Sequence, residues 1–431
     1  MTGAVALCAL LWAAPARASD LILHNGKVFI APGEYADAVA VSGARITAVG
    51  AGEELLARAG PRTRLIDLAG RAVTPGFHDA HVHFWDGAQL SSGAGAGNPL
   101  EEAVASARRL GVTSVSGILE GDRELEAWAE LQRAGKATLR YWMWGRLDAP
   151  ADFTASRERF SSRLPPEKFR WSGLKAWVDG DFDGWTAALF EPYSDKGESR
   201  GSMLRSPRDL LRLVRRGREL GYSVRLHAIG DRAVRAAVRA CAGASERAPW
   251  TPSGGAPAPC VIEHADLVAE ADRTRLASLG IVASMQPSRM IEAGGGERHP
   301  SRLGARRRGA FALKSMQAAG VALAFGSDWP DRTLNPLAGL SAAVARHGEG
   351  EEGPDESLTL EEAVSHYTAG AARAAGAGRE LGVIRPGYRA DLVVFDRDLF
   401  SLPSGEILKA RVDVTIFDGE IVYERVDAGK F

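Results

Sequence analysis

The stretch PGFHDAHVHF (Pro75–Phe84) decides the fold, because it ends an apolar run with two histidines one residue apart. Alternate side chains of a strand point to the same side, so His81 and His83 can reach one ion. Seven further apolar runs follow, and stretches with helical periodicity lie between them. We expect strands over Ala80–Phe84, Thr113–Gly117, Leu139–Trp144, Leu174–Val178, Ser223–His227, Val261–His264, Ile281–Met285 and Val321–Phe325.

This alternation predicts an α/β protein whose centre, residues 74–379, is a (β/α)8 TIM barrel, because all-parallel strands covered by helices are as apolar as these. Residues 19–73 and 380–431 are instead rich in short β-like runs, such as Leu21–Ile30 and Val412–Phe417. We expect the two chain ends to meet in one small β-sandwich domain.

Residues 1–18 are typical of a signal peptide. Ala4–Ala14 is apolar, and Ala16-Arg17-Ala18 fits a cleavage signature. We therefore expect a periplasmic or secreted protein, or a cytoplasmic one if the leader does not function. Removal of the leader also removes Cys8. Cys241 and Cys260 are then either two buried thiols or, in an oxidising compartment, one disulfide.

The charge balance bears on possible partners. The chain has 53 basic and 54 acidic residues, a formal net charge of −1. It has no basic surplus with which to bind nucleic acid or an anionic membrane. We expect a small-molecule partner, no membrane contact after leader removal, and leave a homodimer open.

Potential metal ligands follow the other predicted strands. Lys175 belongs to the fourth strand, His227 and His264 end the fifth and sixth, and Asp328 lies just past the eighth. Active sites of TIM barrels lie at the carboxyl ends of the strands, so these groups should converge with His81 and His83. Imidazoles with a carboxylate suit zinc or another divalent metal.

Lys175 has two interpretations. It lies in an apolar run, and alternation places it on one face with Trp177 and Asp179. A buried, charged and unpaired lysine is costly, so Lys175 either pairs with Asp179 or is carboxylated by CO2 to become an anionic bridge between two metals. We favour the carboxylated form.

The ordered set of motifs resembles the amidohydrolase superfamily, and most of all its family-3 branch, which includes N-substituted formamide deformylases. The stretches that carry the resemblance are PGFHDAHVHF (75–84), LKAWVDG (174–180), HAIGDRAV (227–234), IEHADLV (262–268), SMQPS (284–288), FGSDWP (325–330) and GVIRPGYRADLVVFD (382–396). The H-x-H alone would be weak, whereas this ordered set is specific.

The resemblance implies a zinc centre of two ions per chain, with other divalent metals possible. His81 and His83 would hold the more buried ion, with Asp328 as a further ligand. Carboxylated Lys175 would bridge to a second ion held by His227 and His264. Asp328 would also be the catalytic residue that accepts a proton from the attacking water and returns it to the leaving nitrogen.

The remaining observations are candidate substrate contacts and departures from the family pattern. Trp85 and Trp329 are candidates to line a pocket for an apolar group, and Gln286 and Arg289 are candidate substrate contacts. The segment between His83 and the second predicted strand is shorter than in many relatives, which weakens any transfer of substrate preference. The other departures are His78, where relatives have an aliphatic residue, and Ser116-Gly117, where many relatives have a polar His/Asp pair.

These observations lead to one leading hypothesis and two alternatives. The first is a metal-dependent hydrolase that cleaves a non-peptide C–N bond, of amide or formamide type, with a metal-activated hydroxide. The second keeps the metals but cleaves an ester, lactone or phosphotriester. The third is a non-catalytic, exported barrel that binds a small ligand.

Overall fold

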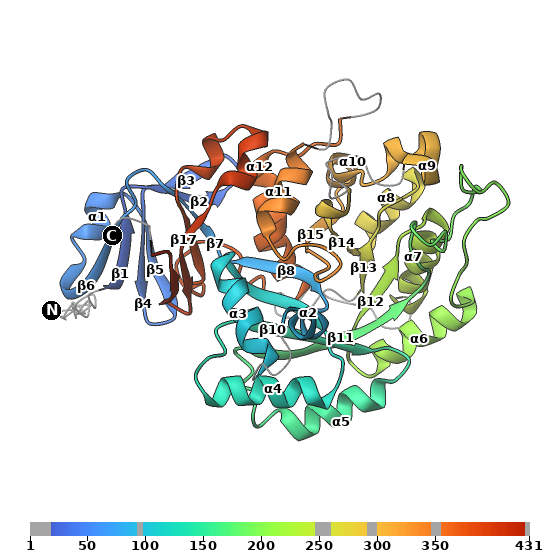
Figure 1. Cartoon of the computed structure of the whole chain (residues 1–431), viewed down its shortest axis with the longest axis horizontal. Coiled ribbons are helices and arrows are strands. Elements are labelled where there is room, and N and C mark those ends of the chain that lie inside the picture. The colour runs from blue at the N-terminus through green and yellow to red at the C-terminus, as the bar shows by residue number, and fades with distance from the viewer. Residues whose placement is uncertain (1–18, 93–97, 246–259, 291–299, 346–354, 427–431) are drawn as a thin grey trace, which may run out of the picture.

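The computed structural model describes residues 19–92, 98–245, 260–290, 300–345 and 355–426. It consists of a barrel and, beside it, two β-sheets built from both ends of the chain (Figure 1). The predicted signal peptide at residues 1–18 lies outside the described residues. Within those residues no helix has the length and apolar character needed to cross a membrane.

Eight parallel strands form the barrel, and they neighbour one another in the order of the sequence. They are β8 (Phe77–Val82), β9 (Val112–Ile118), β10 (Arg140–Arg146), β11 (Phe169–Trp177), β12 (Ser223–Ala228), β13 (Cys260–His264), β14 (Val282–Met285) and β15 (Ala322–Phe325). All eight predicted strands are thus confirmed. The segment after β15 approaches β8, because the Asp328 amide donates to the His81 carbonyl and the His83 amide to the Trp329 carbonyl, both at 2.8 Å.

The first barrel strand ends two residues earlier than predicted. It ends at Val82, and His83 is the N-cap of the helix α2 (Phe84–Ser91). His83 therefore lies outside the strand, and its side chain is 26% exposed whereas that of His81 is fully buried. The H-x-H spacing predicted that strand alternation alone places both imidazoles on one side. Because His83 lies outside the strand, this alternation does not position its imidazole.

Helices cover the outside of the barrel (Figure 1). They are α3 (Pro99–Arg109), α4 (Asp122–Arg133), α5 (Pro150–Phe160), α6 (Pro207–Glu219), α7 (Asp231–Ser245), α8 (Glu270–Ser278), α10 (Leu313–Ala318), α11 (Pro336–Val344) and α12 (Leu360–Ser365). Cys241 of α7 forms a disulfide with Cys260 of β13, with a Cα–Cα distance of 6.2 Å. The oxidised alternative for the two cysteines is the one found.

The terminal sheets pack against each other as a sandwich, which confirms the predicted meeting of the chain ends. One has the order β5-β4-β1-β6 and the other β18-β17-β16-β7-β2-β3. Their strands are β1 (Ser19–His24), β2 (Lys27–Ala31), β3 (Glu34–Ala36), β4 (Ala38–Ser42), β5 (Arg45–Gly50), β6 (Ala59–Asp67), β7 (Ala72–Pro75), β16 (Leu392–Phe395), β17 (Val412–Phe417) and β18 (Glu420–Glu424). Leu23 and Val41 of one sheet share a buried core with Val394 and Ile416 of the other.

A buried charge cluster joins the barrel to the C-terminal strands. Arg140 of β10 is 1% exposed, and its guanidinium lies 2.9 Å from Asp391 and also binds Asp418. Arg389 adds a second ion pair to Asp418, at 2.9 Å. Burial opposes the charge of Arg140, but the two carboxylates outweigh it and raise its pKa above the ordinary value. We call these four residues the seam cluster.

Candidate metal centre

A cavity of about 510 Å³ opens at the carboxyl ends of the barrel strands. Five of the six predicted metal ligands line it: His83, Lys175, His227, His264 and Asp328. The sixth, His81, is fully buried, and its Nε2 atom lies 2.9 Å from the Lys175 Nζ atom. The structure therefore brings all six predicted ligands to one end of the barrel.

The innermost group consists of His81, His264 and Asp328. One ligand atom from each lies within 4.8 Å of the others, a spacing that one ion could span. The His81 Nε2 atom is 3.3 Å from Asp328 Oδ1, and the His83 Nε2 atom is 3.9 Å from the same oxygen. Asp328, in the segment that follows β15, thus faces both histidines of the H-x-H motif.

His83 also belongs to a second, more exposed group. Its Nδ1 atom lies 3.9 Å from carboxylate oxygens of Asp86 and Glu120. These two side chains are 50% and 41% exposed, so water competes for them. The arrangement leaves Nε2 of His83 directed toward Asp328.

In two of the histidines, a hydrogen bond at one ring nitrogen defines which nitrogen is unprotonated. His264 Nδ1 lies 2.7 Å from Gln286 Oε1, while the Gln286 amide nitrogen donates to the Ser284 carbonyl, so Gln286 accepts the Nδ1 proton. His227 Nε2 lies 3.1 Å from the Gly180 carbonyl, which can only accept. His264 therefore presents Nε2 and His227 presents Nδ1 as unprotonated nitrogens, the state that binds a metal.

The backbone is strained at two of the predicted ligands. His264 has φ 74° and Asp328 has φ 61°, in the left-handed region that non-glycine residues rarely adopt. At His264 this interrupts the alternation of β13, so that Glu263 and His264 both face the barrel interior. Such strain clusters at functional sites, where the surrounding structure holds it.

Burial sets the protonation of the donors. It lowers the pKa of His81 to about 4 and that of His227 to about 3, and holds the pKa of His264 well below its ordinary value. Burial also lowers the pKa of Lys175 to about 8. Burial alone would raise the pKa of Asp328, but its hydrogen bond with His81 and nearby positive charge keep it well below the usual range. Neutral imidazoles with an ionised carboxylate fit a divalent metal.

The suggested Lys175–Asp179 pair is not among the ion pairs of the described residues. The Asp179 carboxylate instead accepts hydrogen bonds from the backbone amides of Ala188, Ile229 and Gly230, at 2.8–3.1 Å. The Lys175 ammonium contacts His81 and lies 5.0 Å from the centre of the Trp177 ring. Lys175 therefore faces the site and not Asp179.

The predicted substrate contacts fall into two groups. Gln286 and Arg289 support predicted ligands: Gln286 binds His264, and the Arg289 guanidinium lies 2.7 Å from Asp328 Oδ2. Arg289 also lines the metal-facing cavity, whereas Gln286 is fully buried. Trp329 packs on Phe84, with ring centres 5.5 Å apart, and Trp85 packs against the same core.

Sequence reasoning missed two buried polar pairs in the barrel. Arg225 of β12 and Glu263 of β13 are both fully buried and form an ion pair of 2.6 Å. His78 lies 3.1 Å from the Ser116 hydroxyl, so the two departures from the family pattern are partners. Arg225 had a signal, since it stands two residues before His227 and so shares its face of the strand.

Fold and site together define a class: (β/α)8 barrels with a metal-ligand-rich mouth and a β-sandwich made from both chain ends. Within that class, this chain belongs to the amidohydrolase family, whose model matches residues 96–423. His81 and His83 precede the matched region, and the other four predicted ligands lie inside it.

Two curated relatives are similar over part of their length. The putative amidohydrolase YtcJ of Bacillus subtilis (strain 168) is 33% identical over 261 residues, which are 59% of this chain and 47% of the relative. The N-substituted formamide deformylase of Arthrobacter pascens is 30% identical over 269 residues, 61% of this chain and 48% of the relative. The chain thus spans about half the length of these relatives.

Solved structures share the fold. An uncharacterized metal-dependent hydrolase from Pyrococcus furiosus superposes with a TM-score of 0.75 at 22% identity, over 88% of this chain and 100% of the other. An adenosine deaminase from Xanthomonas campestris with bound zinc gives a TM-score of 0.65 at 17% identity, over 95% and 94% of the two chains. At these identities the likeness establishes the architecture alone.

Proposed function

We propose that this protein is a metal-dependent hydrolase that cleaves a non-peptide C–N bond of amide or formamide type. The observation that carries the proposal is the convergence of His81, His83, His227, His264, Lys175 and Asp328 on one cavity. Family membership supports the chemistry, because relatives in the family are named amidohydrolase and formamide deformylase.

The metal is proposed to be zinc, with two ions per chain. His81, His83 and Asp328 would hold one ion and His227 and His264 the other, with carboxylated Lys175 between them. A bound divalent cation supplies an acidified water and polarises the carbonyl of the substrate. The unprotonated nitrogens that His264 and His227 present to the cavity support this assignment.

Asp328 is proposed to move the proton. Its carboxylate is ionised, 6% exposed and lies in the cavity wall, so it can accept a proton from the attacking water and later deliver one to the leaving nitrogen. Arg289, at 2.7 Å, fixes the position of the other carboxylate oxygen. Arg289 itself also binds Asp331 at 3.1 Å, so the loop after β15 is held as a unit.

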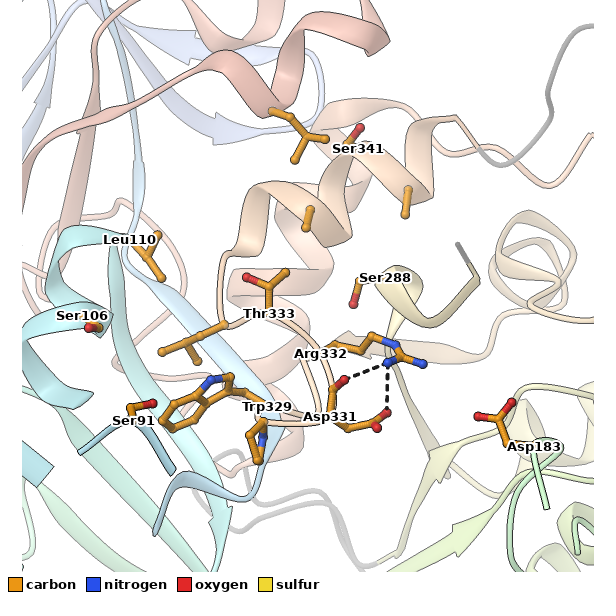
Figure 2. A pocket seen from close by; sticks show the side chains of 15 residues that line it. Ser91, Ser106, Leu110, Asp183, Ser288, Trp329, Asp331, Arg332, Thr333 and Ser341 are labelled. Atoms are coloured by element: carbon orange, nitrogen blue, oxygen red, sulfur yellow. Dashed lines mark hydrogen bonds and ion pairs between the residues drawn. The ribbon is translucent and has the colours of Figure 1, made fainter. Parts of the chain in front are cut away.

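A second cavity could bind an apolar substituent of the substrate. It has a volume of about 960 Å³ and shares Pro330 and Asp331 with the metal-facing cavity. Figure 2 shows Trp329 among the side chains that line it, and Arg332 donates to the Asp331 carbonyl at 2.7 Å. We propose that an aromatic or aliphatic group of the substrate lies against Trp329, and that Trp329→Ala raises KM for bulky substrates more than for small ones.

Export to the periplasm or the exterior is also proposed. The signal-like residues 1–18 motivate it, and the Cys241–Cys260 disulfide supports an oxidising compartment. The expected partner is a small amide-type molecule. Mass measurement of the mature protein recovered from cell fractions tests cleavage after residue 18.

The test of the function uses metal-free protein prepared with a chelator and then reloaded with zinc in bicarbonate buffer. N-formyl and N-acyl amines with small and aromatic groups are compared with esters of the same acids. We expect zinc-dependent release of the amine. Hydrolysis confined to the esters would instead favour the ester alternative, and binding without turnover would favour the ligand-binding one.

A further inference from the structure

His81 differs from its two partners in how its second ring nitrogen is held. His264 and His227 each donate to an acceptor, Gln286 and the Gly180 carbonyl, at 2.7 and 3.1 Å. The Nδ1 atom of His81 is buried and makes no hydrogen bond within the described part of the chain. A buried imidazole nitrogen without a hydrogen-bond partner lowers the stability of the fold. The group nearest to this nitrogen is therefore its candidate partner.

The group that faces this nitrogen is a carboxylate. Glu263 Oε2 lies 4.0 Å from His81 Nδ1, and both side chains are fully buried. This oxygen also makes no hydrogen bond with a described residue. A movement of about 1 Å would bring the two atoms to the usual hydrogen-bond length. Nε2 of His81 meanwhile faces Lys175 and Asp328, on the side of the proposed metal.

Arg225 holds the carboxylate in this position. Its guanidinium binds Glu263 Oε1 at 2.6 Å and also donates to the Ala80 carbonyl of β8, next to His81. The face of Trp144 covers the guanidinium, 4.0 Å from the ring centre. One oxygen of Glu263 is thus fixed by Arg225, which leaves the other free to accept from His81.

We propose that Glu263, fixed by Arg225, is a positioning residue that accepts the Nδ1 proton of His81 and so directs Nε2 of His81 to the metal. The inference rests on the proposed function, because it concerns the metal centre named there. Carboxylate partners of this kind orient metal-binding histidines, and their removal costs about 10–100-fold in metal affinity.

The test measures the affinity of the full chain for zinc alone, by competition with a chromophoric chelator. Three variants are compared with the parent: Glu263→Gln, the double variant Arg225→Met with Glu263→Met, and Asp391→Asn. The double variant removes both charges together, so no buried charge is left unpaired. Asp391→Asn is the matched control, because it breaks the buried Arg140–Asp391 ion pair away from the cavity.

We expect the double variant to bind zinc about 10–100-fold more weakly than the parent. Glu263→Gln should lose less, because its amide oxygen can still accept the Nδ1 proton, and Asp391→Asn should bind zinc like the parent. A folded double variant with the affinity of the parent would overturn the inference. If the double variant does not fold, Glu263→Leu, which has no acceptor for the Nδ1 proton, takes its place, and parental affinity in that variant overturns the inference. A parent chain that binds no zinc would overturn the proposed function as well.

Discussion

Two buried clusters of charged residues in this chain are built on opposite principles. In the seam cluster each cation meets a carboxylate: Arg140 binds Asp391 and Asp418, and Arg389 binds Asp418. At the metal-facing cavity burial instead pushes the side chains toward their neutral forms, as the lowered pKa values of Lys175 and His227 indicate. The first cluster pairs its charges internally and joins two parts of the fold, whereas the second offers donors that a ligand can complete.

The largest expected effect lies at the cavity. Asp328→Asn keeps the shape of the side chain but removes the proposed proton acceptor, so kcat/KM for an amide substrate should fall by about 10²–10⁴-fold. Asp355→Asn, which alters an exposed ion pair with Lys314, is the control and should retain activity. Steady-state rates measure the effect, and an active Asp328→Asn enzyme would remove Asp328 from the mechanism.

The seam cluster should respond in stability and not in metal binding. Asp391→Asn leaves the buried Arg140 with Asp418 alone, and loss of a partner from a buried pair costs about 3 kcal/mol of unfolding free energy. Denaturant unfolding measures this, and metal analysis of the same sample should give the parental content. A loss of metal with no loss of stability would reverse the comparison.

The sequence predicted the fold and the ligands of the metal-facing cavity, but not the seam cluster. The eight strands followed from apolar runs, and the convergence of the ligands followed from the His, Lys or Asp that lies in or just past five of these runs. The left-handed backbone at His264 could not be predicted, because local propensity disfavours it in a non-glycine residue. Glu263 was missed because it reads as an ordinary polar residue until the barrel closes and places it opposite His81. Arg225 shares a strand face with His227, but the sequence does not show that Glu263 is its partner.

A pH series separates the two clusters further. The unfolded chain keeps the Lys175 proton up to the ordinary pKa of 10.5, whereas the folded chain loses it at about 8. Between these values the unfolded state binds more protons, so the unfolding free energy of metal-free, CO2-free protein should rise with pH, by about 3 kcal/mol at most from this group. Lys175→Met should flatten that rise, as measured by denaturant unfolding. An equal rise in both proteins would contradict the pKa.

A smaller effect is expected from the support of His264. Gln286→Leu leaves the His264 Nδ1 proton without its acceptor, which should weaken zinc binding about tenfold. The chain offers a matched control in Gln317→Leu, because Gln317 Oε1 lies 2.7 Å from a nitrogen of His366 outside the cavity. Chelator competition should separate the two variants, and equal zinc affinity would mean that Gln286 does not orient His264.

The most direct test of the metal centre is the metal content of the purified protein, by plasma mass spectrometry after expression with zinc and bicarbonate. We predict about two zinc ions per chain, held by the six residues at the barrel mouth. A single ion would remove the case for Lys175 as a carboxylated bridge. Folded protein that binds no divalent metal would contradict the account.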